Sequence, residues 1–333
     1  MYKQIIYFGA PGTGKSHYVK EKELDGVSKT KIFRVTIHPE YTYSDFIGQL
    51  LPKASLSGGS VEFKFNSGPF TEALVEAHSD TSQKVYLVLE EISRGNVAAI
   101  FGDIFQLLDR DNNSHESKFP IRNKNISDQI IQLSDDNIKL PPNFNIIGTV
   151  NVNDQNVFPM DTAFKRRFEW EYITSRPALD ASGIIDSKLN NANIQVSIDD
   201  VPANNLTTNW QSFYTSLNAF ITDKENGMGK SEDKQLGQFF VDFGEKFVED
   251  SHSADATTAQ EANKKINSIM RNKLLLYLWQ DVQGHSSFNK SKKLFHSDIK
   301  SFDDLYTKYG NDKVFSDDFI DKFLSPNLTK YSY

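Results

Sequence analysis

A glycine-rich loop directly after an apolar run constrains the fold of this chain more than any other sequence feature. The apolar run is Gln4–Phe8, and the loop that follows reads Gly9, Ala10, Pro11, Gly12, Thr13, Gly14, Lys15 and Ser16. This loop matches G-x-x-x-x-G-K-[ST], a pattern that holds nucleotide phosphates between a strand and a helix. Its glycines let backbone N–H groups turn inward and form an anion-binding concavity. A helix is predicted from Lys15 to about Glu23, and its amino end would face the same phosphates.

The residues of this loop have separate expected roles in binding a nucleoside triphosphate. Lys15 can reach the β- and γ-phosphates, and the Ser16 hydroxyl can ligate Mg²⁺. The other contacts to the nucleotide are expected from Gly9, Pro11, Gly12, Thr13 and Gly14. The alternative is a glycine-rich turn that binds nothing, but the complete pattern and both flanking elements favour the nucleotide site.

Composition narrows the class of protein. With 333 residues the chain has room for two domains. It contains no cysteine, which excludes disulfides and thiolate metal sites and fits a cytoplasmic protein. No apolar run approaches the length of a membrane span, and the start of the chain lacks the basic region of a signal peptide, so no membrane contact is expected. A net charge of −7 argues against a large basic surface, so nucleic acid would need a local basic strip or a partner.

Apolar, β-branched runs alternate with helical patterns over residues 1–176. The strand candidates are Gln4–Phe8, Lys31–Ile37, Val85–Leu89, Asn145–Gly148 and Phe168–Ile173. The helical patterns between them lie near His17–Glu23, Tyr43–Leu51, Thr71–His78 and Ala98–Asp109. Alternation of this kind predicts an α/β domain in which helices cover both faces of a parallel sheet. Two polar segments, Pro52–Ser67 with a turn at Gly58-Gly59 and Asp111–Pro142, are expected to be insertions.

The character of the chain changes after residue 176. Residues 177–209 are rich in Asn, Asp and Ala, which is typical of a connector with at most short elements. From Trp210 to the end, residues 210–333, the patterns predict a helical domain. Its helix candidates are Trp210–Thr222, Gly237–Val248, Ala259–Val282, Phe302–Tyr309 and Asp317–Phe323.

The third strand candidate runs into two consecutive acids, Glu90 and Glu91. In a P-loop ATPase site the first such acid holds Mg²⁺ and the second polarises the attacking water. The metal ligands are therefore expected to be Ser16 and Glu90, with Glu91 as the catalytic carboxylate that activates water. The first position is usually Asp, and the extra methylene of Glu90 shifts the carboxylate by about 1.5 Å. The alternative is an acidic strand end facing solvent, but the phosphate loop upstream favours the catalytic interpretation.

Three more residues complete the predicted chemistry. Asn151 ends the fourth strand candidate, where an amide can hydrogen-bond the catalytic water or the γ-phosphate, although a lone Asn there is more often a turn former. Arg166 and Arg167 precede the fifth strand candidate and in isolation are typical of ordinary surface cations. In a ring of identical subunits, however, the pair would reach a neighbour's γ-phosphate and stabilise transition-state charge.

Taken together, these segments resemble the AAA+ family, and more narrowly the McrB-type motor of modification-dependent restriction systems. Three further segments carry the resemblance: His38–Gly48, Glu91–Asp103 and Glu232–Phe240. The first is similar to the family's segment after the second strand, the second to its E-I-N-R-G-N…I-F-G-E stretch, and the third to its lid motif. The resemblance implies an AAA+ P-loop domain with a five-stranded parallel sheet sandwiched by helices, followed by a small all-α lid domain.

The resemblance also implies an Mg²⁺-dependent nucleoside triphosphatase that forms a homo-oligomeric ring, expected to be a hexamer. Cleavage would belong to a separate McrC-like nuclease subunit, and DNA would be contacted through that partner. McrB-type proteins carry M-N-T-A-D-R-S after the fourth strand, a signature tied to GTP, and here only Asn151 and Asp154 match it. Asp154 is therefore expected to contact the nucleotide, while the choice between ATP and GTP stays open.

Other interpretations of the same sequence remain. McrB-type proteins place a DNA-recognition domain ahead of the motor, whereas this sequence starts at the motor's first strand, so recognition is expected on another subunit or the chain is a fragment. One rival is a MoxR- or dynein-related ATPase that remodels protein partners without DNA. A second rival is a switch that binds nucleotide without hydrolysing it, which the glutamate at position 90 keeps open.

Overall fold

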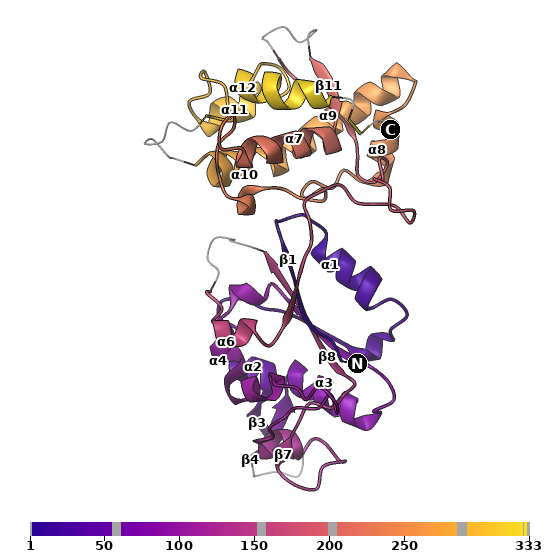
Figure 1. Ribbon diagram of the computed structural model, residues 1–333, viewed down its shortest axis with the longest axis vertical. Helices are drawn as coiled ribbons and strands as arrows, with labels where there is room; N and C mark the ends of the chain where they lie inside the picture. The colour runs from indigo at the N-terminus through magenta and orange to yellow at the C-terminus, as the bar shows by residue number, and fades with distance from the viewer. Residues whose placement is uncertain are drawn as a thin grey trace. The chain divides into compact units, whose positions relative to one another are not determined.

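The computed structural model of the protein describes residues 2–54, 61–151, 158–198, 205–284, 292–328 and 330–331. Two units divide the chain (Figure 1). The first comprises Met1–Phe8 and Lys15–Tyr172, and the second comprises Gly9–Gly14 and Ile173–Tyr333. Each unit has its own hydrophobic core. None of the described helices has the length and apolar composition that a membrane span requires.

A five-stranded sheet in the order β2-β5-β8-β1-β9 forms the centre of the first unit. Its strands are β1 (Gln4–Gly9), β2 (Ile32–Thr36), β5 (Val85–Glu90), β8 (Phe144–Asn151) and β9 (Glu169–Tyr172). The pairs β2–β5, β5–β8 and β1–β9 are parallel. The predicted parallel sheet and its five strands are confirmed. Because the strands run the same way, the acids that end β5 and the amide that ends β8 come to one edge.

Helices cover both faces of this sheet, as the alternation of side chains along β5 shows. Val85, Leu87 and Leu89 are buried in one core cluster, which they share with side chains of α2 (Tyr43–Ile47), α3 (Pro69–Ser79), α4 (Val97–Phe101) and α6 (Thr162–Lys165). Tyr86 and Val88 are buried on the opposite face. On that face the ring of Tyr7 lies 5.2 Å from the ring of Tyr18, which belongs to α1 (Lys15–Tyr18).

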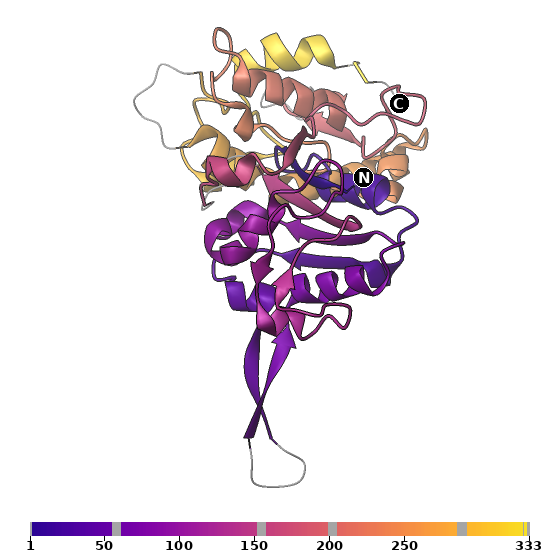
Figure 2. The ribbon, with the colours of Figure 1, turned by 60° about the horizontal axis from the view of Figure 1, so that its bottom comes forward.

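The first insertion is a β-hairpin, and it replaces part of a predicted helix. The expected helix Tyr43–Leu51 ends at Ile47, because Gly48 takes a φ of +125° and starts β3 (Gly48–Ala54). β3 pairs with β4 (Val61–Ser67) in an antiparallel ribbon that projects from the α/β unit (Figure 2). The predicted turn at Gly58-Gly59 lies outside the described residues. The sequence alone does not distinguish the two structures here, because Leu50 and Leu51 fit the apolar spacing of a helix and also that of a strand.

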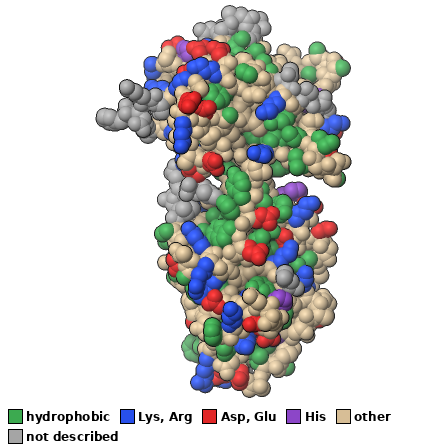
Figure 3. Space-filling view, in the orientation of Figure 1, with side chains coloured by type: hydrophobic (Ala, Val, Ile, Leu, Met, Phe, Trp, Pro, Cys, Tyr) green, Lys and Arg blue, Asp and Glu red, His purple; other side chains and the backbone are tan. Residues whose placement is uncertain are grey.

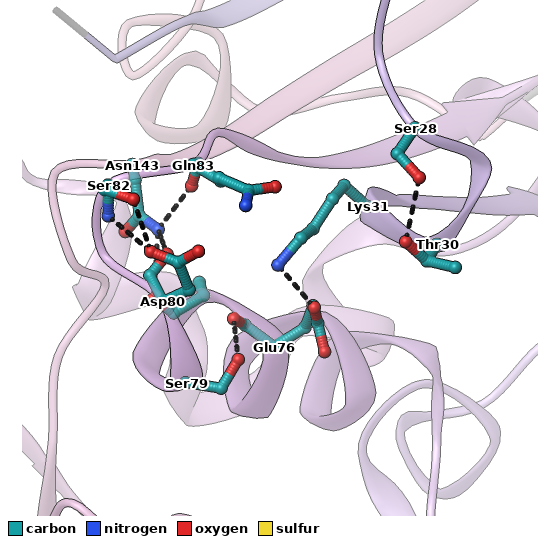
Figure 4. Close-up of polar contacts among 10 residues, drawn as sticks. Ser28, Thr30, Lys31, Glu76, Ser79, Asp80, Ser82, Gln83 and Asn143 are labelled. Atoms are coloured by element: carbon teal, nitrogen blue, oxygen red, sulfur yellow. Dashed lines mark hydrogen bonds and ion pairs between the residues drawn. The ribbon is translucent and has the colours of Figure 1, made fainter.

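The second insertion contains short elements beside the sheet: β6 (Ile121–Arg122), α5 (Lys124–Ser127) and β7 (Asn137–Ile138). Just after it, Asn143 links the start of β8 to the last turn of α3 and to the segment that follows α3 (Figure 4). The Asn143 Nδ2 group donates to the carbonyls of Ala77, Asp80 and Gln83 at 2.9, 3.1 and 2.8 Å. These bonds fix the amino-terminal edge of the sheet, opposite the edge where the predicted acids end β5.

The second unit is mainly helical. Its helices are α7 (Trp210–Thr222), α8 (Glu245–Ser251), α9 (Ala256–Lys273), α10 (Leu275–Tyr277), α11 (Phe302–Lys308) and α12 (Asp317–Phe319). The predicted connector contributes β10 (Asn193–Val196) and β11 (Leu206–Asn209), which pair antiparallel. The helix predicted at Trp210–Thr222 is confirmed, with Trp210 and Phe213 fully buried. The prediction of a helix over Gly237–Val248 is wrong in its first part, because α8 begins only at Glu245.

Candidate functional site

The glycine-rich loop has a backbone that only its glycines adopt without strain. Gly12 has a φ of +76° and Gly14 a φ of +86°, both in the left-handed region. Between them, the Thr13 hydroxyl donates to the Ala10 carbonyl at 3.1 Å. Gly12 and Gly14 are therefore needed for the shape of the loop as well as for any approach of a phosphate.

The segment Gly237–Phe240 packs directly on this loop, and the two group together in the second unit. The Gly237 N–H donates to the Pro11 carbonyl at 2.9 Å, and the Phe239 N–H donates to the Gly12 carbonyl at 2.8 Å. A Cβ atom at Gly237 would overlap the backbone of Gly12 and Thr13. This contact explains why the predicted helix does not begin at Gly237, since the segment follows the loop instead of coiling.

Lys15 is buried, with 7% of its surface exposed. Burial lowers its pKa to about 8, and the carboxylates of Glu91 and Glu90 only partly oppose this effect. The folded chain thus disfavours the charge of Lys15 in the absence of a bound anion. A phosphate beside Lys15 would reverse this balance, because an opposite charge favours the protonated amine.

The Glu90 carboxylate is fixed through both of its oxygens. Oε2 accepts hydrogen bonds from Ser16 Oγ at 2.9 Å and from Thr149 Oγ1 at 2.6 Å. Oε1 forms an ion pair with the Arg34 guanidinium. The predicted metal ligands Ser16 and Glu90 are thus in direct contact, held by a strand β8 hydroxyl and a strand β2 cation.

Glu91 lies at a strained turn immediately after β5. Its φ is +56°, a left-handed conformation that is uncommon for residues other than glycine. Its N–H donates to Thr149 Oγ1 at 3.2 Å, which anchors this turn to β8. Its Oε1 accepts from Asn151 Nδ2 at 2.7 Å, and its Oε2 pairs with Arg94 Nε at 3.3 Å. The Glu91 carboxylate therefore contacts Asn151 and Arg94, a different set of partners from that of Glu90.

Arg166 and Arg167, which are adjacent in sequence, have different surroundings. The Arg167 side chain is 10% exposed and its Nη2 pairs with Asp109 Oδ2 at 2.6 Å, while its guanidinium lies over the Phe105 ring. Arg166 is exposed and lines a cavity of about 720 Å³ that Asn151 also lines. The structure thus brings Arg166, and not Arg167, to the cavity beside Asn151.

The Ser16–Glu90 pair has the chemistry that Mg²⁺ prefers. Mg²⁺ is commonly held by one or two carboxylates and by oxygens of the bound phosphates, and it keeps several waters. One carboxylate and one hydroxyl beside a phosphate loop fit that pattern. Within the described ranges no three His, Asp or Glu side chains cluster into an all-protein metal site. Asp154, which the resemblance placed at the nucleotide, lies outside the described residues.

Sequence reasoning missed three contributors to the site: Arg34, Thr149 and Gly237. Arg34 is a charged residue inside an otherwise apolar strand candidate, and Thr149 is a hydroxyl two residues before Asn151. Both residues are therefore unusual for their positions in the sequence, but only the register of the strands shows that each of them contacts Glu90. Gly237 lay in a recognised motif, yet its contact is with residues more than 200 positions away.

Comparison with known proteins gives three matches. The family model for the AAA domain (dynein-related subfamily) matches residues 4–168. The Type II restriction enzyme BsuMI component YdiS of Bacillus subtilis (strain 168) is 32% identical over 342 residues, which cover 95% of this chain and 88% of that protein. The Type IV methyl-directed restriction enzyme EcoKMcrB subunit of Escherichia coli (strain K12) is 26% identical over 181 residues, which cover 54% of this chain and 36% of that protein.

Proposed function

The chain belongs to the AAA+ family, in its McrB-type branch, and on this premise we propose that it is the motor subunit of a restriction system. In this proposal it hydrolyses the β–γ bond of ATP or GTP with Mg²⁺ and assembles into a ring, expected to be a hexamer. A separate McrC-like nuclease subunit cleaves the DNA.

The division of partners between two adjacent acids carries the proposal. Glu90 accepts a hydrogen bond from the phosphate-loop hydroxyl of Ser16, whereas Glu91, which has a left-handed backbone, accepts one from Asn151. An acid that holds a metal and an acid that activates water need such different surroundings, because one must stay with the phosphates and the other must reach the nucleophile. A merely solvent-facing acidic strand end would not separate the two.

The residues then act as follows. The backbone of the loop at Gly12 and Gly14 and the amine of Lys15 bind the phosphates. Ser16 and Glu90 would hold Mg²⁺, which neutralises charge on the phosphate oxygens when bound. Other nucleotide contacts are proposed from Gly9, Pro11, Thr13 and Asp154.

Hydrolysis depends on the second acid and its amide partner. Glu91 accepts a proton from the attacking water, and Asn151 holds the Glu91 carboxylate at 2.7 Å in position for that step. The water oxygen forms a bond to the γ-phosphorus, the β–γ phosphoanhydride bond breaks, and the nucleoside diphosphate is the leaving group, so that the products are this diphosphate and inorganic phosphate. The strain at the Glu91 backbone fits this role, since strained residues concentrate at functional sites.

Arg166 is the residue that we propose to act across the ring. It is exposed and lines the cavity beside Asn151, whereas Arg167 is held within its own subunit by Asp109. An arginine supplied by a neighbour stabilises transition-state charge and raises turnover by about 10³–10⁵-fold. Mixing inactive Arg166→Ala and Glu91→Gln chains tests this role, because mixed rings regain some sites with an intact acid and a neighbouring arginine. Failure of such mixtures to recover turnover would remove the ring assignment.

Contact with DNA is assigned to the partner on grounds of charge. The net charge is −7, and on the face that Figure 3 shows, Lys and Arg side chains are interspersed with Asp and Glu. A mixed surface gives little of the counterion release that drives unaided DNA binding. The similarity to a restriction enzyme component, which covers 95% of this chain, supports a role in restriction over other functions of an AAA+ ATPase.

Phosphate release from ATP and from GTP by the purified chain tests the core of the proposal. Lys15→Ala should lose nucleotide affinity, whereas Glu91→Gln should bind nucleotide and fail to turn it over. Normal hydrolysis by Glu91→Gln would refute the catalytic assignment. Absence of turnover in the unaltered chain, with and without its nuclease partner, would favour the non-hydrolysing switch.

A second candidate is an ATPase that remodels protein partners, and the β3–β4 hairpin favours it. Leu50, Val61 and Phe63 expose 53%, 63% and 66% of their surfaces on this ribbon. Exposed apolar surface of this kind marks protein contacts. Stimulation of turnover by a protein substrate in the absence of DNA and nuclease would support this alternative.

A further inference from the structure

Strand register brings Arg34 to Glu90. β2 and β5 run parallel, with Arg34 opposite Val88 and Thr36 opposite Glu90. Val88 and Glu90 lie two residues apart and therefore face the same side of the sheet. The long side chain of Arg34 thus reaches Glu90 diagonally across this side, and its Nη1 atom forms an ion pair with Glu90 Oε1.

The Glu90 carboxylate is enclosed and fully engaged. Its side chain is 12% exposed, against 39% for Arg34, so the acid is the buried member of the pair. While Oε1 pairs with Arg34, Oε2 accepts hydrogen bonds from the hydroxyls of Ser16 at 2.9 Å and Thr149 at 2.6 Å. One carboxylate oxygen is therefore committed to the sheet, and the other faces the phosphate loop.

A glutamate at this position needs such a restraint more than an aspartate does. Glu90 has one more rotatable bond than Asp, so its carboxylate can reach more orientations. An exposed ion pair contributes little to stability. This pair differs, because its acid is only 12% exposed and the other oxygen of that acid binds a loop residue.

We propose that Arg34 is a positioning residue that compensates for the glutamate at position 90. By holding Oε1 it directs Oε2 toward Ser16 and keeps the carboxylate where the shorter acid of related sites would place it. The inference rests on the proposed function of Ser16 and Glu90 in holding Mg²⁺. Arg34 itself contacts neither metal nor nucleotide in this scheme and acts through Glu90.

The Mg²⁺ dependence of nucleotide binding tests the inference without relying on turnover. Binding of a fluorescent, non-hydrolysable ATP or GTP analogue is titrated with Mg²⁺ for the unaltered chain and for Arg34→Met, Arg34→Lys and Arg34→Gln. Arg34→Met should raise the Mg²⁺ concentration for half-maximal binding by about tenfold, the lower end of effects seen for residues that orient metal ligands. Arg34→Lys should recover part of this loss, because it restores a cation. Arg122→Met, which removes an 81% exposed arginine paired with Asp136, serves as the control and should change nothing.

A double-mutant comparison shows whether Arg34 acts through Glu90. In a Glu90→Asp background the shorter acid needs no restraint, so adding Arg34→Met should change the Mg²⁺ requirement by less than about twofold. If Arg34→Met raised the Mg²⁺ requirement equally in both backgrounds, the inference would be overturned, since the effect of Arg34 would then come from its positive charge and not from its contact with Glu90. Tighter Mg²⁺ binding by Arg34→Met would also overturn it, since Arg34 would then compete with the metal.

Failure of the inference can be told from failure of the proposed function. If Arg34→Met and Arg34→Gln are folded and keep the normal Mg²⁺ requirement while Ser16→Ala and Glu90→Gln raise it, Arg34 has no positioning role and the metal site stands. If Ser16→Ala and Glu90→Gln also leave the requirement unchanged, the proposed metal site is wrong and the inference falls with it. Circular dichroism and thermal unfolding of each variant establish that the chain is folded.

Discussion

Replacing Lys15 with methionine should stabilise the nucleotide-free chain while abolishing its response to nucleotide. Lys15 is 7% exposed, and burial lowers its pKa from 10.5 to about 8. The folded chain therefore holds this proton less tightly than the unfolded chain does. Methionine has a similar length and no charge, so Lys15→Met keeps the packing of the stem and removes the cost of burying an ammonium.

The size of the effect follows from the pKa. One pKa unit corresponds to about 1.4 kcal/mol, so a fall in the pKa from 10.5 to about 8 corresponds to at most about 3.5 kcal/mol. This cost is present in full below pH 8, where Lys15 is charged in both states. It is relieved as the pH rises from about 8 to 10.5, because the folded chain then binds fewer protons than the unfolded chain. The advantage of Lys15→Met should therefore be largest at pH 7 and disappear near pH 10.5.

Urea unfolding at several pH values between 7 and 10.5 measures this difference. Lys20→Met, which changes a 72% exposed lysine in the same segment, is the matched control and should show no such trend. Added nucleotide at 100 times its dissociation constant should stabilise the unaltered chain by about 2.7 kcal/mol and leave Lys15→Met unchanged. If Lys15→Met were less stable than the unaltered chain at pH 7, or if their difference did not vary with pH, the argument from buried charge would be refuted.

Three further predictions concern contacts seen around the site. Gly237→Ala should weaken nucleotide binding and destabilise the chain by about 1–3 kcal/mol, since its Cβ would overlap the loop backbone; an unchanged dissociation constant by fluorescence titration would contradict this. Asn151→Ala should lower turnover by about 100-fold with little change in nucleotide affinity, because it removes the hydrogen bond to Glu91; steady-state kinetics together with equilibrium binding distinguish this from a loss of binding. Arg167→Ala should destabilise the chain by about 1–3 kcal/mol by leaving Asp109 unpaired, whereas Arg166→Ala should keep its stability and lose turnover; the opposite pattern in thermal unfolding and phosphate release would exchange their roles.

Local sequence patterns were enough to predict the strands of the sheet and the phosphate loop that follows the first strand. The apolar runs of β1, β5 and β8 form the largely buried inner strands, because a parallel sheet covered on both faces needs apolar residues there. The edge strands β2 and β9 are more exposed. The loop glycines required the left-handed backbone that Gly12 and Gly14 adopt. The contact between Glu91 and Asn151 was not predicted, although parallel strands bring the ends of β5 and β8 to one edge of the sheet.

Several features depended on contacts that no local pattern encodes. Gly237 follows the phosphate loop through hydrogen bonds to residues far away in the chain, which removed the first part of a predicted helix. The end of another predicted helix is strand β3 instead, because Leu50 and Leu51 pair with Phe65 and Lys64 of β4, the next strand along the chain. Propensity is a weak guide where two structures satisfy the same short apolar run.

From the sequence we predicted that a phosphate loop, two acids and an amide act together at the end of a parallel sheet, and that Arg166 or Arg167 acts on a neighbouring subunit. The three-dimensional structure was needed to show that Asp109 pairs with Arg167, that Arg34 pairs with Glu90, and that Asn151 donates a hydrogen bond to Glu91. The physical reason is that motif and periodicity depend on neighbours along the chain, whereas side-chain pairing depends on strand register and burial. One residue of offset along the chain leaves Arg166 exposed and Arg167 enclosed, and the packing around them sets that difference.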